Sequence, residues 1–401
     1  MQKNKPFFTV AVLKMEIFLP DNIKFVLNRL QECGYECFIV GGCVRDLLLN
    51  KTPNDYDVTT NALPNEIKDI FEKTVDTGIK HGTVTVIIDG EPIEVTTYRT
   101  ENGYSDCRRP DSVNFVSNIE CDLARRDFTV NAICYNQNIG FKDCFGGMDD
   151  IKNKLLRAVG NPEERFTEDA LRILRLFRFS SVLGFEIEKE TYLSALKCSN
   201  LLKKVSMERI ATELKKTALG SKTEAILPLI EKDALGFINL KNTFQIDKIS
   251  KLPKTDNLRF FALLNLCSTD LTQTVCLLKL SNNFKNYCKS MSELEKEEIV
   301  CDKVSIKKLL QKYGYDILID FYYYKNVFYN TDMASIKKLT DDIIENKEPY
   351  CINHLAINGN DLKNLGIKDK NIGKSLQRLL KEVITKPELN TKEQLTEIIK
   401  K

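Results

Sequence analysis

Two aspartates separated by one residue are the most chemically suggestive pair in the sequence. Asp55 and Asp57 stand in the stretch DYDV, and the β-branched residues that follow predict a strand. Side chains two apart on a strand point to the same side, so the two carboxylates would repel each other unless a cation lies between them. Mg²⁺ favours such oxygen ligands and completes its shell with water and phosphate. The pair therefore predicts a magnesium site; the alternative is an edge strand whose aspartates only face water.

A third carboxylate, Glu94, lies in the stretch IEVTTYR, another run that favours a strand. Two divalent ions held by three such carboxylates can bind both the attacking hydroxyl and the leaving oxygen of a phosphoryl displacement. We therefore predict that Asp55, Asp57 and Glu94 are the catalytic residues, with Asp55 and Asp57 as the metal ligands. The alternative role for Glu94 is a salt bridge to a basic side chain.

A pair of glycines precedes the aspartates. Gly41 and Gly42 follow the apolar run 37–40 and open a segment of helical periodicity that carries Arg45 and Asp46. Glycines let a ligand approach the backbone closely, and the N–H groups at the start of a helix favour phosphate oxygens. A glycine pair alone is most often a turn, but the acidic pair downstream favours a phosphate site here.

The stretch 168–178, EDALRILRLFR, places Asp169 ahead of three arginines, Arg172, Arg175 and Arg178. Its periodicity predicts one continuous helix, on which these four residues occupy one half of the circumference while apolar residues fill most of the other. Two leucines interrupt the polar half, which indicates that this face is partly enclosed. The alternative is a solvated basic face.

An enclosed carboxylate beside an enclosed guanidinium can distinguish nucleobases. Carboxylate only accepts hydrogen bonds, and guanidinium only donates them. Cytosine and adenine present an amine beside an acceptor ring nitrogen, whereas uracil and guanine present a carbonyl beside a ring N–H. Asp169 with Arg172 would accept the first two bases and reject the others, because a mismatched base leaves buried polar groups unpaired.

The elements that must position these residues differ between the two parts of the chain. Up to about residue 150, strand runs such as 83–88 and 93–98 alternate with helical segments, and beyond it strand signals nearly vanish. The expected fold is α+β, with a small mixed sheet in an N-terminal head and an extended helical remainder. We expect a catalytic head at 1–150, a neck that recognises the incoming base at 151–220, a helical body at 221–335 and a helical tail at 336–401.

The composition narrows the class of protein. Of the 401 residues, 43% are hydrophobic and 29% charged, and the net charge of +3 leaves nucleic-acid binding to local patches of Lys and Arg. Two histidines exclude HD-type phosphohydrolases, and thirteen cysteines without a Cys-x-x-Cys pair argue against structural zinc. No stretch approaches the roughly 20 apolar residues of a membrane span. We expect a cytoplasmic protein without a membrane partner.

Four motifs together resemble one family. Gly41-Gly42-x-x-Arg45-Asp46 followed by Asp55-x-Asp57 resembles motif A of the polymerase-β-like nucleotidyltransferases. The stretches 122–132, 145–179 and 206–214 resemble later motifs of the class II tRNA nucleotidyltransferases. These are the bacterial and eukaryotic CCA-adding enzymes and the related bacterial poly(A) polymerases. The resemblance covers about residues 35 to 220 in order.

The resemblance implies template-independent addition of CCA to the 3′ end of tRNA from CTP and ATP, by metal-assisted nucleotidyl transfer with release of pyrophosphate. Mg²⁺ would be the cofactor, and tRNA would be the partner, bound by the tail at 336–401. The enzyme itself would be a monomer or a homodimer. An A-adding enzyme, a poly(A) polymerase of the same family and an inactive RNA-binding protein are the alternatives. The family's Glu-Asp-x-x-Arg motif recognises the incoming nucleotide. The implied nucleotide-binding residues are Gly42, Arg45, Arg126, Asp127, Glu168, Asp169, Arg172, Arg175 and Arg178.

Three further segments complete the sequence-based expectations. The stretch 99–116 contains Gly, Ser, Asp and Pro and predicts a mobile loop; in this family a loop here helps to switch the pocket from C to A. The lysine-rich stretches 202–216 and 368–383 are candidates for contacts with RNA phosphates. His81 is expected to belong to a structural turn.

Overall fold

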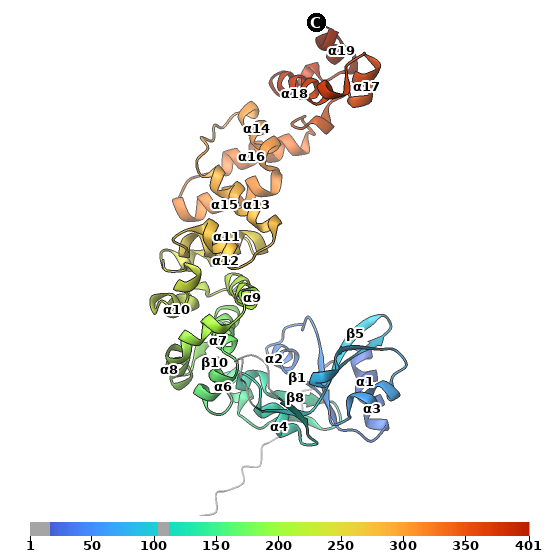
Figure 1. Ribbon diagram of the computed structural model, residues 1–401, viewed down its shortest axis with the longest axis vertical. Coiled ribbons are helices and arrows are strands. Elements are labelled where there is room, and N and C mark those ends of the chain that lie inside the picture. The colour runs from blue at the N-terminus through green and yellow to red at the C-terminus, as the bar shows by residue number, and fades with distance from the viewer. Residues whose placement is uncertain (1–16, 103–111, 401) are drawn as a thin grey trace, which may run out of the picture. The chain divides into compact units, whose positions relative to one another are not determined.

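The computed structural model describes residues 17–102 and 112–400. The chain divides into two compact units, Met1–Lys241 and Asn242–Lys401. All strands of the described residues lie in the first unit (Figure 1). The predicted α+β fold class is confirmed. The finer division into head, neck, body and tail stays a prediction.

A seven-stranded mixed sheet forms the centre of the head. Its order is β3-β4-β5-β2-β1-β8-β9. The strands are β1 (Cys37–Val40), β2 (Asp57–Thr60), β3 (Thr74–Gly78), β4 (Thr83–Ile88), β5 (Glu91–Thr97), β8 (Ile133–Asn136) and β9 (Gly140–Asp143). β2 runs parallel to β5, and the other neighbours run antiparallel. The apolar runs 37–40 and 83–88 are strands as predicted, and β1 is buried along its whole length.

The prediction of a loop over 99–116 is wrong at both ends of this stretch, which form strands. β6 (Arg99–Asn102) and β7 (Ser112–Phe115) pair as an antiparallel hairpin, with Arg99 opposite Phe115. The Gly and Pro residues that predict a loop belong to 103–111, which lie outside the described residues. Val113 and Phe115 alternate with polar residues instead, which is the pattern of a strand.

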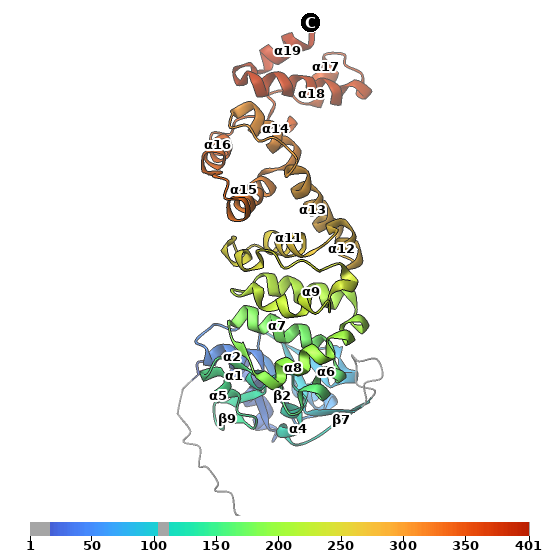
Figure 2. The ribbon, with the colours of Figure 1, turned by 90° about the vertical axis from the view of Figure 1, so that its left-hand side faces the viewer.

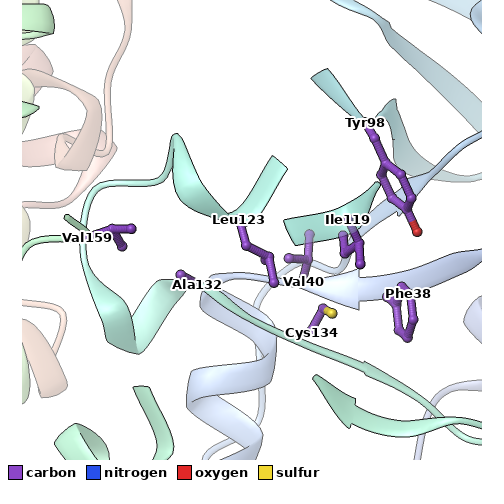
Figure 3. Close-up of a cluster of buried hydrophobic side chains, with 8 residues drawn as sticks. All are labelled: Phe38, Val40, Tyr98, Ile119, Leu123, Ala132, Cys134 and Val159. Carbon is purple, nitrogen blue, oxygen red and sulfur yellow. The ribbon is translucent and has the colours of Figure 1, made fainter. Parts of the chain in front are cut away.

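A buried apolar cluster joins the sheet to helix α4 (Ile119–Ala124). It consists of Phe38, Val40, Tyr98, Ile119, Leu123, Ala132, Cys134 and Val159 (Figure 3). Ile119 and Leu123 lie four residues apart and form the buried face of α4. Because α4 ends just before Arg125 and Arg126, this cluster fixes the position of the basic pair.

The first unit contains further helices. They are α1 (Asp21–Glu32), α2 (Gly42–Leu48), α3 (Pro64–Ile70), α5 (Gly147–Lys152), α6 (Pro162–Glu168), α7 (Leu171–Leu183), α8 (Lys189–Cys198), α9 (Met207–Ala218) and α10 (Leu227–Glu231). The short strands β10 (Leu155–Leu156) and β11 (Glu186–Ile187) pair in parallel. Helices α7 and α9 lie side by side (Figure 2).

The prediction of one continuous helix over 168–178 is wrong. Helix α6 ends at Glu168, Asp169 has extended dihedral angles of φ −136° and ψ 101°, and α7 begins at Leu171. The Asp169 carboxylate accepts a hydrogen bond of 3.0 Å from the backbone N–H of Leu171. A short acidic side chain that binds the backbone in this way favours the start of a new helix over the continuation of the old one.

Among its described residues, the second unit contains helices joined by turns and loops, and it has no strand. Its α-helices are α11 (Asp256–Cys267), α12 (Leu271–Leu277), α13 (Asn282–Leu294), α14 (Lys303–Tyr313), α15 (Tyr315–Tyr329), α16 (Ala334–Glu345), α17 (Gly359–Asn364), α18 (Asp369–Thr385) and α19 (Lys392–Lys400). Lys307 of α14 is fully buried and forms an ion pair of 2.8 Å with Glu348. Among the residues that the structure describes, no helix has the length and apolar character needed to cross a bilayer.

Candidate active site

The turn between β1 and α2 is shaped by a glycine. Gly41 has a φ of +84°, a conformation that side chains disfavour. A Cβ atom at this position would lie 2.8 Å from Nη1 of Arg126, so the guanidinium lies directly against the glycine and would have to shift for any other residue. The predicted phosphate turn is therefore accompanied by a basic side chain from far along the sequence.

The predicted acidic residues come together at one edge of the head. Asp57 begins β2, and its register partner on the parallel strand β5 is Glu94. Register partners on neighbouring strands project to the same side of a sheet. Asp55 lies just before β2, and all three carboxylates line one hollow of about 700 Å³.

The electrostatics at Asp57 favour a bound cation. Loss of hydration raises the pKa of Asp57, and the negative charges of Asp55 and Glu94 raise it further. The guanidinium of Arg126 opposes this shift and lowers the pKa. Within the described residues no three His, Cys, Asp or Glu side chains are close enough to hold one metal ion together. The carboxylates of Asp55 and Asp57 are oxygen donors of the kind that Mg²⁺ takes together with water and phosphate, so the predicted donor set fits that ion.

The carboxylate of Asp169 is held by a residue that sequence reasoning missed. Arg209 on α9 donates two hydrogen bonds to it, of 3.2 and 2.7 Å. Arg209 and Glu213 lie four apart on this helix and therefore share one face. This spacing of charged residues within the motif 206–214 is the sequence signal from which Arg209 could have been predicted as a site residue.

Arg172 is bound by residues of α6 and by the chain that follows α4. Its guanidinium forms an ion pair of 2.6 Å with Glu168 and donates to the carbonyl of Arg125 at 2.8 Å and to that of Arg165 at 3.2 Å. It is 8% exposed, which confirms that this face of the helix is enclosed. Asp169 and Arg172 are thus held by separate partners, and their charges do not neutralise each other in a direct pair.

Arg175 binds a carboxylate of the head. Its Nε and Nη2 atoms donate to Asp127 at 2.8 and 2.6 Å. Burial alone would raise the pKa of Asp127, but Arg175 and a hydrogen bond from Asn131 hold that pKa well below its usual range. Asp127 is therefore ionised and occupied by protein partners. Its predicted contact with a nucleotide stays a prediction.

An aromatic ring, also missed from the sequence, lies among three of the predicted arginines. The guanidinium carbons of Arg45, Arg175 and Arg178 lie 5.1, 5.3 and 3.9 Å from the centroid of Phe179. Arg178 forms an ion pair of 2.8 Å with Glu213, and burial lowers the pKa of Arg178 to about 10. The three cations are thus gathered around one buried ring.

Arg45 and His81 have identifiable structural contacts. Arg45 donates to the side chain of Asn131 at 2.7 Å and forms an ion pair of 2.7 Å with Asp46. His81 ends a short 3₁₀ turn, and its carbonyl accepts a hydrogen bond from Arg99. The expectation of a structural turn at His81 is confirmed.

Three consecutive residues connect the two groups of predicted site residues. The carbonyl of Arg125 accepts from Arg172, and the carboxylate of Asp127 accepts from Arg175. Between them, Arg126 lies against the glycine turn and its charge acts on Asp57. Residues 125–127 therefore link Arg172 and Arg175, two of the predicted nucleotide-binding residues, to the surroundings of Asp57.

Comparison of the sequence with known proteins identifies the family. Residues 37–157 match the poly A polymerase head domain, and residues 184–236 match the probable RNA and SrmB-binding site of polymerase A. A CCA-adding enzyme of Ligilactobacillus salivarius is 36% identical over 408 residues, with 96% of this chain and 97% of the relative covered. The chain belongs to the family of CCA-adding enzymes. These enzymes are tRNA nucleotidyltransferases.

Other CCA-adding enzymes agree in sequence and in fold. That of Pediococcus pentosaceus is 52% identical over 202 residues, 50% of this chain and 51% of the relative. The chain spans about half the length of this and two Lactobacillus relatives that it matches. The crystal structure of the Bacillus stearothermophilus CCA-adding enzyme in complex with CTP superposes with a TM-score of 0.78 at 28% identity, over 94% of this chain and 96% of the other. The resemblance drawn from the sequence motifs is confirmed.

Proposed function

We propose that this chain adds C, C and A in turn to the 3′ end of tRNA, using CTP and ATP and releasing pyrophosphate. The observation that carries the proposal is the stretch 125–127. Its Arg125 carbonyl accepts from Arg172 and the charge of its Arg126 acts on Asp57, which supports one site that contains both the acidic pair, Asp55 and Asp57, and the base-recognition residues, Asp169 and Arg172. One nucleoside triphosphate can then be bound at both of its ends.

The acidic pair would hold a divalent cation, which we assign as Mg²⁺ because of its carboxylate ligands. When bound, such an ion promotes attack by the 3′ hydroxyl and neutralises charge on the triphosphate. Glu94 lies in the same hollow and maintains its negative field. Arg126 and the N–H groups at the start of α2, which Gly42 opens, would bind phosphate oxygens, because a guanidinium and backbone N–H groups are both donors.

The base would be recognised by hydrogen bonding. The Asp169 carboxylate accepts from the exocyclic amine of cytosine or adenine, and Arg172 donates to the adjacent ring nitrogen. Uracil and guanine would place a carbonyl oxygen against the carboxylate and an N–H against the guanidinium. Arg209 fixes the orientation of the carboxylate through its two hydrogen bonds, so that one rotamer is presented to the base.

The match of residues 184–236 to a probable RNA-binding site supports tRNA as the partner. Phosphate contacts would hold the acceptor arm without regard to its sequence, as an enzyme that serves all tRNAs requires. We place the protein in the cytoplasm because its substrate would be tRNA.

A second candidate is a poly(A) polymerase, favoured by the match of the head to that domain. Incubation of the purified protein with a tRNA that lacks CCA, together with each nucleotide singly and in combination, distinguishes the two. We expect two additions from CTP alone, none from ATP alone and three from both, because the first accepted base must be C. Long adenylate tails would indicate the polymerase, and extension only of CC-ending tRNA by ATP would indicate an A-adding enzyme. No product at all would contradict the proposal.

A further inference from the structure

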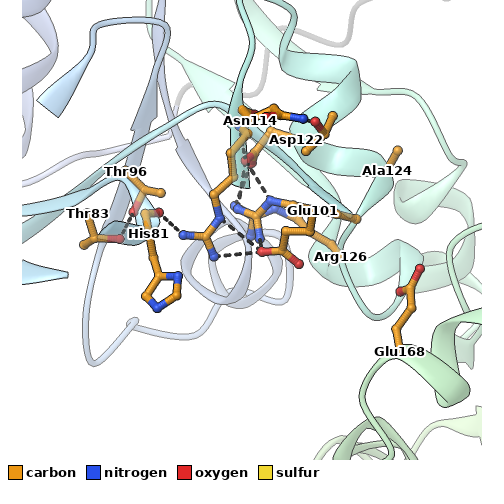
Figure 4. A network of polar contacts seen from close by, with 12 residues as sticks. His81, Thr83, Thr96, Glu101, Asn114, Asp122, Ala124, Arg126 and Glu168 are labelled. Carbon is orange, nitrogen blue, oxygen red and sulfur yellow. Dashed lines mark hydrogen bonds and ion pairs between the residues drawn. The ribbon is translucent and has the colours of Figure 1, made fainter. Parts of the chain in front are cut away.

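Arg126 belongs to a network of five charged side chains (Figure 4). Glu101 forms ion pairs with Arg99 at 2.9 Å and with Arg125 at 3.2 Å. Asp122 forms ion pairs with Arg125 at 2.8 Å and with Arg126 at 3.3 Å. The charged network thus runs from the hairpin β6–β7, which carries Arg99 and Glu101, through the end of α4 to Arg126.

Asp122 is the most enclosed member of the charged network, with none of its surface exposed. Its Oδ1 atom accepts from two nitrogens of Arg125 and from the backbone N–H of Arg99, and its Oδ2 atom accepts from Arg126. Burial alone would raise the pKa of Asp122, but the two arginines hold it below its usual range. A buried carboxylate with this many donors is ionised and rigidly held.

The charged network contains three guanidinium groups and two carboxylates. Arg99 and Arg125 are bound at 2.8 to 3.2 Å, whereas Arg126 has the longest ion pair and a buried Nε atom without a hydrogen-bond partner. The unbalanced positive charge is therefore located on Arg126. Its guanidinium is also the group that lies against Gly41 and acts on Asp57.

We propose that Asp122 is a positioning residue that keeps the guanidinium of Arg126 available for the phosphate groups of the nucleoside triphosphate. Asp57 is the competing carboxylate, since the charge of Arg126 already acts on it. With Asp122 neutral, Arg126 loses its only ion pair in the charged network and turns toward Asp57. The phosphate groups then lose this donor, and the nucleotide must compete with Asp57 for the guanidinium, which weakens nucleotide binding.

The inference rests on the proposed function, because it assumes that the ligand beside Arg126 carries phosphates. Asp122→Asn removes the charge and preserves the shape of the side chain. We expect the KM for CTP and for ATP to rise about tenfold with kcat within about threefold of that of the unaltered protein. Inhibition by pyrophosphate, measured as an inhibition constant, should weaken by a similar factor, while binding of cytidine, which has no phosphate, stays unchanged in calorimetry.

Two comparisons separate positioning from a general loss of stability. Asp150→Asn is the matched control: Asp150 is 5% exposed and pairs with Arg157 at 3.2 Å, away from the charged network. It should lower the melting temperature as Asp122→Asn does and leave the KM for CTP unchanged. In a protein that already carries Arg126→Ala, Asp122→Asn should change the KM by less than about twofold, since effects through one group are not additive.

Either of two results would overturn the inference. One is a KM for CTP and a pyrophosphate inhibition constant that Asp122→Asn leaves unchanged. The other is a tenfold effect that persists in full in the Arg126→Ala background, because Asp122 would then act through another group. Failure of the proposed function is a separate result: the unaltered protein itself would then add no nucleotide to tRNA.

Discussion

Asp57→Ala should lower the rate of nucleotide incorporation by at least about a thousandfold, or roughly 4 kcal/mol in the activation free energy. Asp57 is the member of the acidic pair that lies in the sheet, beside Glu94 and within the field of Arg126. Its removal leaves Asp55 as the single ligand of the acidic pair. The attacking hydroxyl and the triphosphate then both lose the cation that aligns them.

Single-turnover incorporation of CMP into a tRNA that lacks CCA measures this effect, and gel retardation of the same tRNA measures binding. Binding should stay within about threefold of its original value, because RNA phosphates are neutralised by basic side chains elsewhere. Asp76→Ala is the matched control, since Asp76 lies on β3 of the same sheet in an exposed pair with Lys68. It should leave the rate unchanged. An unchanged rate in Asp57→Ala would refute the metal assignment.

Asp169→Ala should relax the exclusion of UTP and GTP by about a hundredfold relative to CTP. The carboxylate accepts a hydrogen bond from the exocyclic amine of cytosine or adenine, whereas the carbonyl oxygen of uracil or guanine repels it. A hydrogen bond to a charged group is worth about 1.5 to 3 kcal/mol. A site built to bind a particular hydrogen-bonding group rejects analogues because its own polar groups would stay unpaired. With the carboxylate absent, uracil no longer faces a repelling oxygen.

Competition between CTP and UTP for one primer tRNA measures the change as a ratio of kcat/KM values. Glu163→Ala provides the control, because Glu163 lies on α6, close to Asp169 in sequence, and forms an exposed pair with Lys197. Its selectivity should equal that of the unaltered protein. If Asp169→Ala stays as strict as the control, base selection resides elsewhere and our assignment is wrong.

The head was largely predictable because its signals are local. An apolar run bounded by glycines gave β1 and the start of α2, and a β-branched run gave β4. The placement of Asp57 opposite Glu94 could not be inferred in the same way. It depends on the register of two parallel strands that lie 37 positions apart in the sequence, and single-sequence periodicity does not determine pairing.

The base-recognition residues show where periodicity misleads. The apolar spacing of 168–178 predicts one helix, but the hydrogen bond from Leu171 to Asp169 and the contact of Asp169 with Arg209 separate α6 from α7. Arg209 follows Asp169 by forty residues. The ion pairs of Asp127 with Arg175 and of Asp122 with Arg126 could not be predicted from local sequence patterns either, because the burial of a carboxylate is determined by tertiary packing. The candidate site residues could be predicted from the sequence, but the side chains with which they form ion pairs and hydrogen bonds could not.

A crystal structure of the protein with CTP and Mg²⁺ tests the central claim most directly, namely that one nucleotide is bound by the head and the neck together. We expect the triphosphate beside Arg126 and the Gly41-Gly42 turn, a magnesium ion on Asp57, and the cytosine amine within 3.2 Å of Asp169. A cytosine ring turned away from Asp169, or a triphosphate remote from Asp57, would contradict the account.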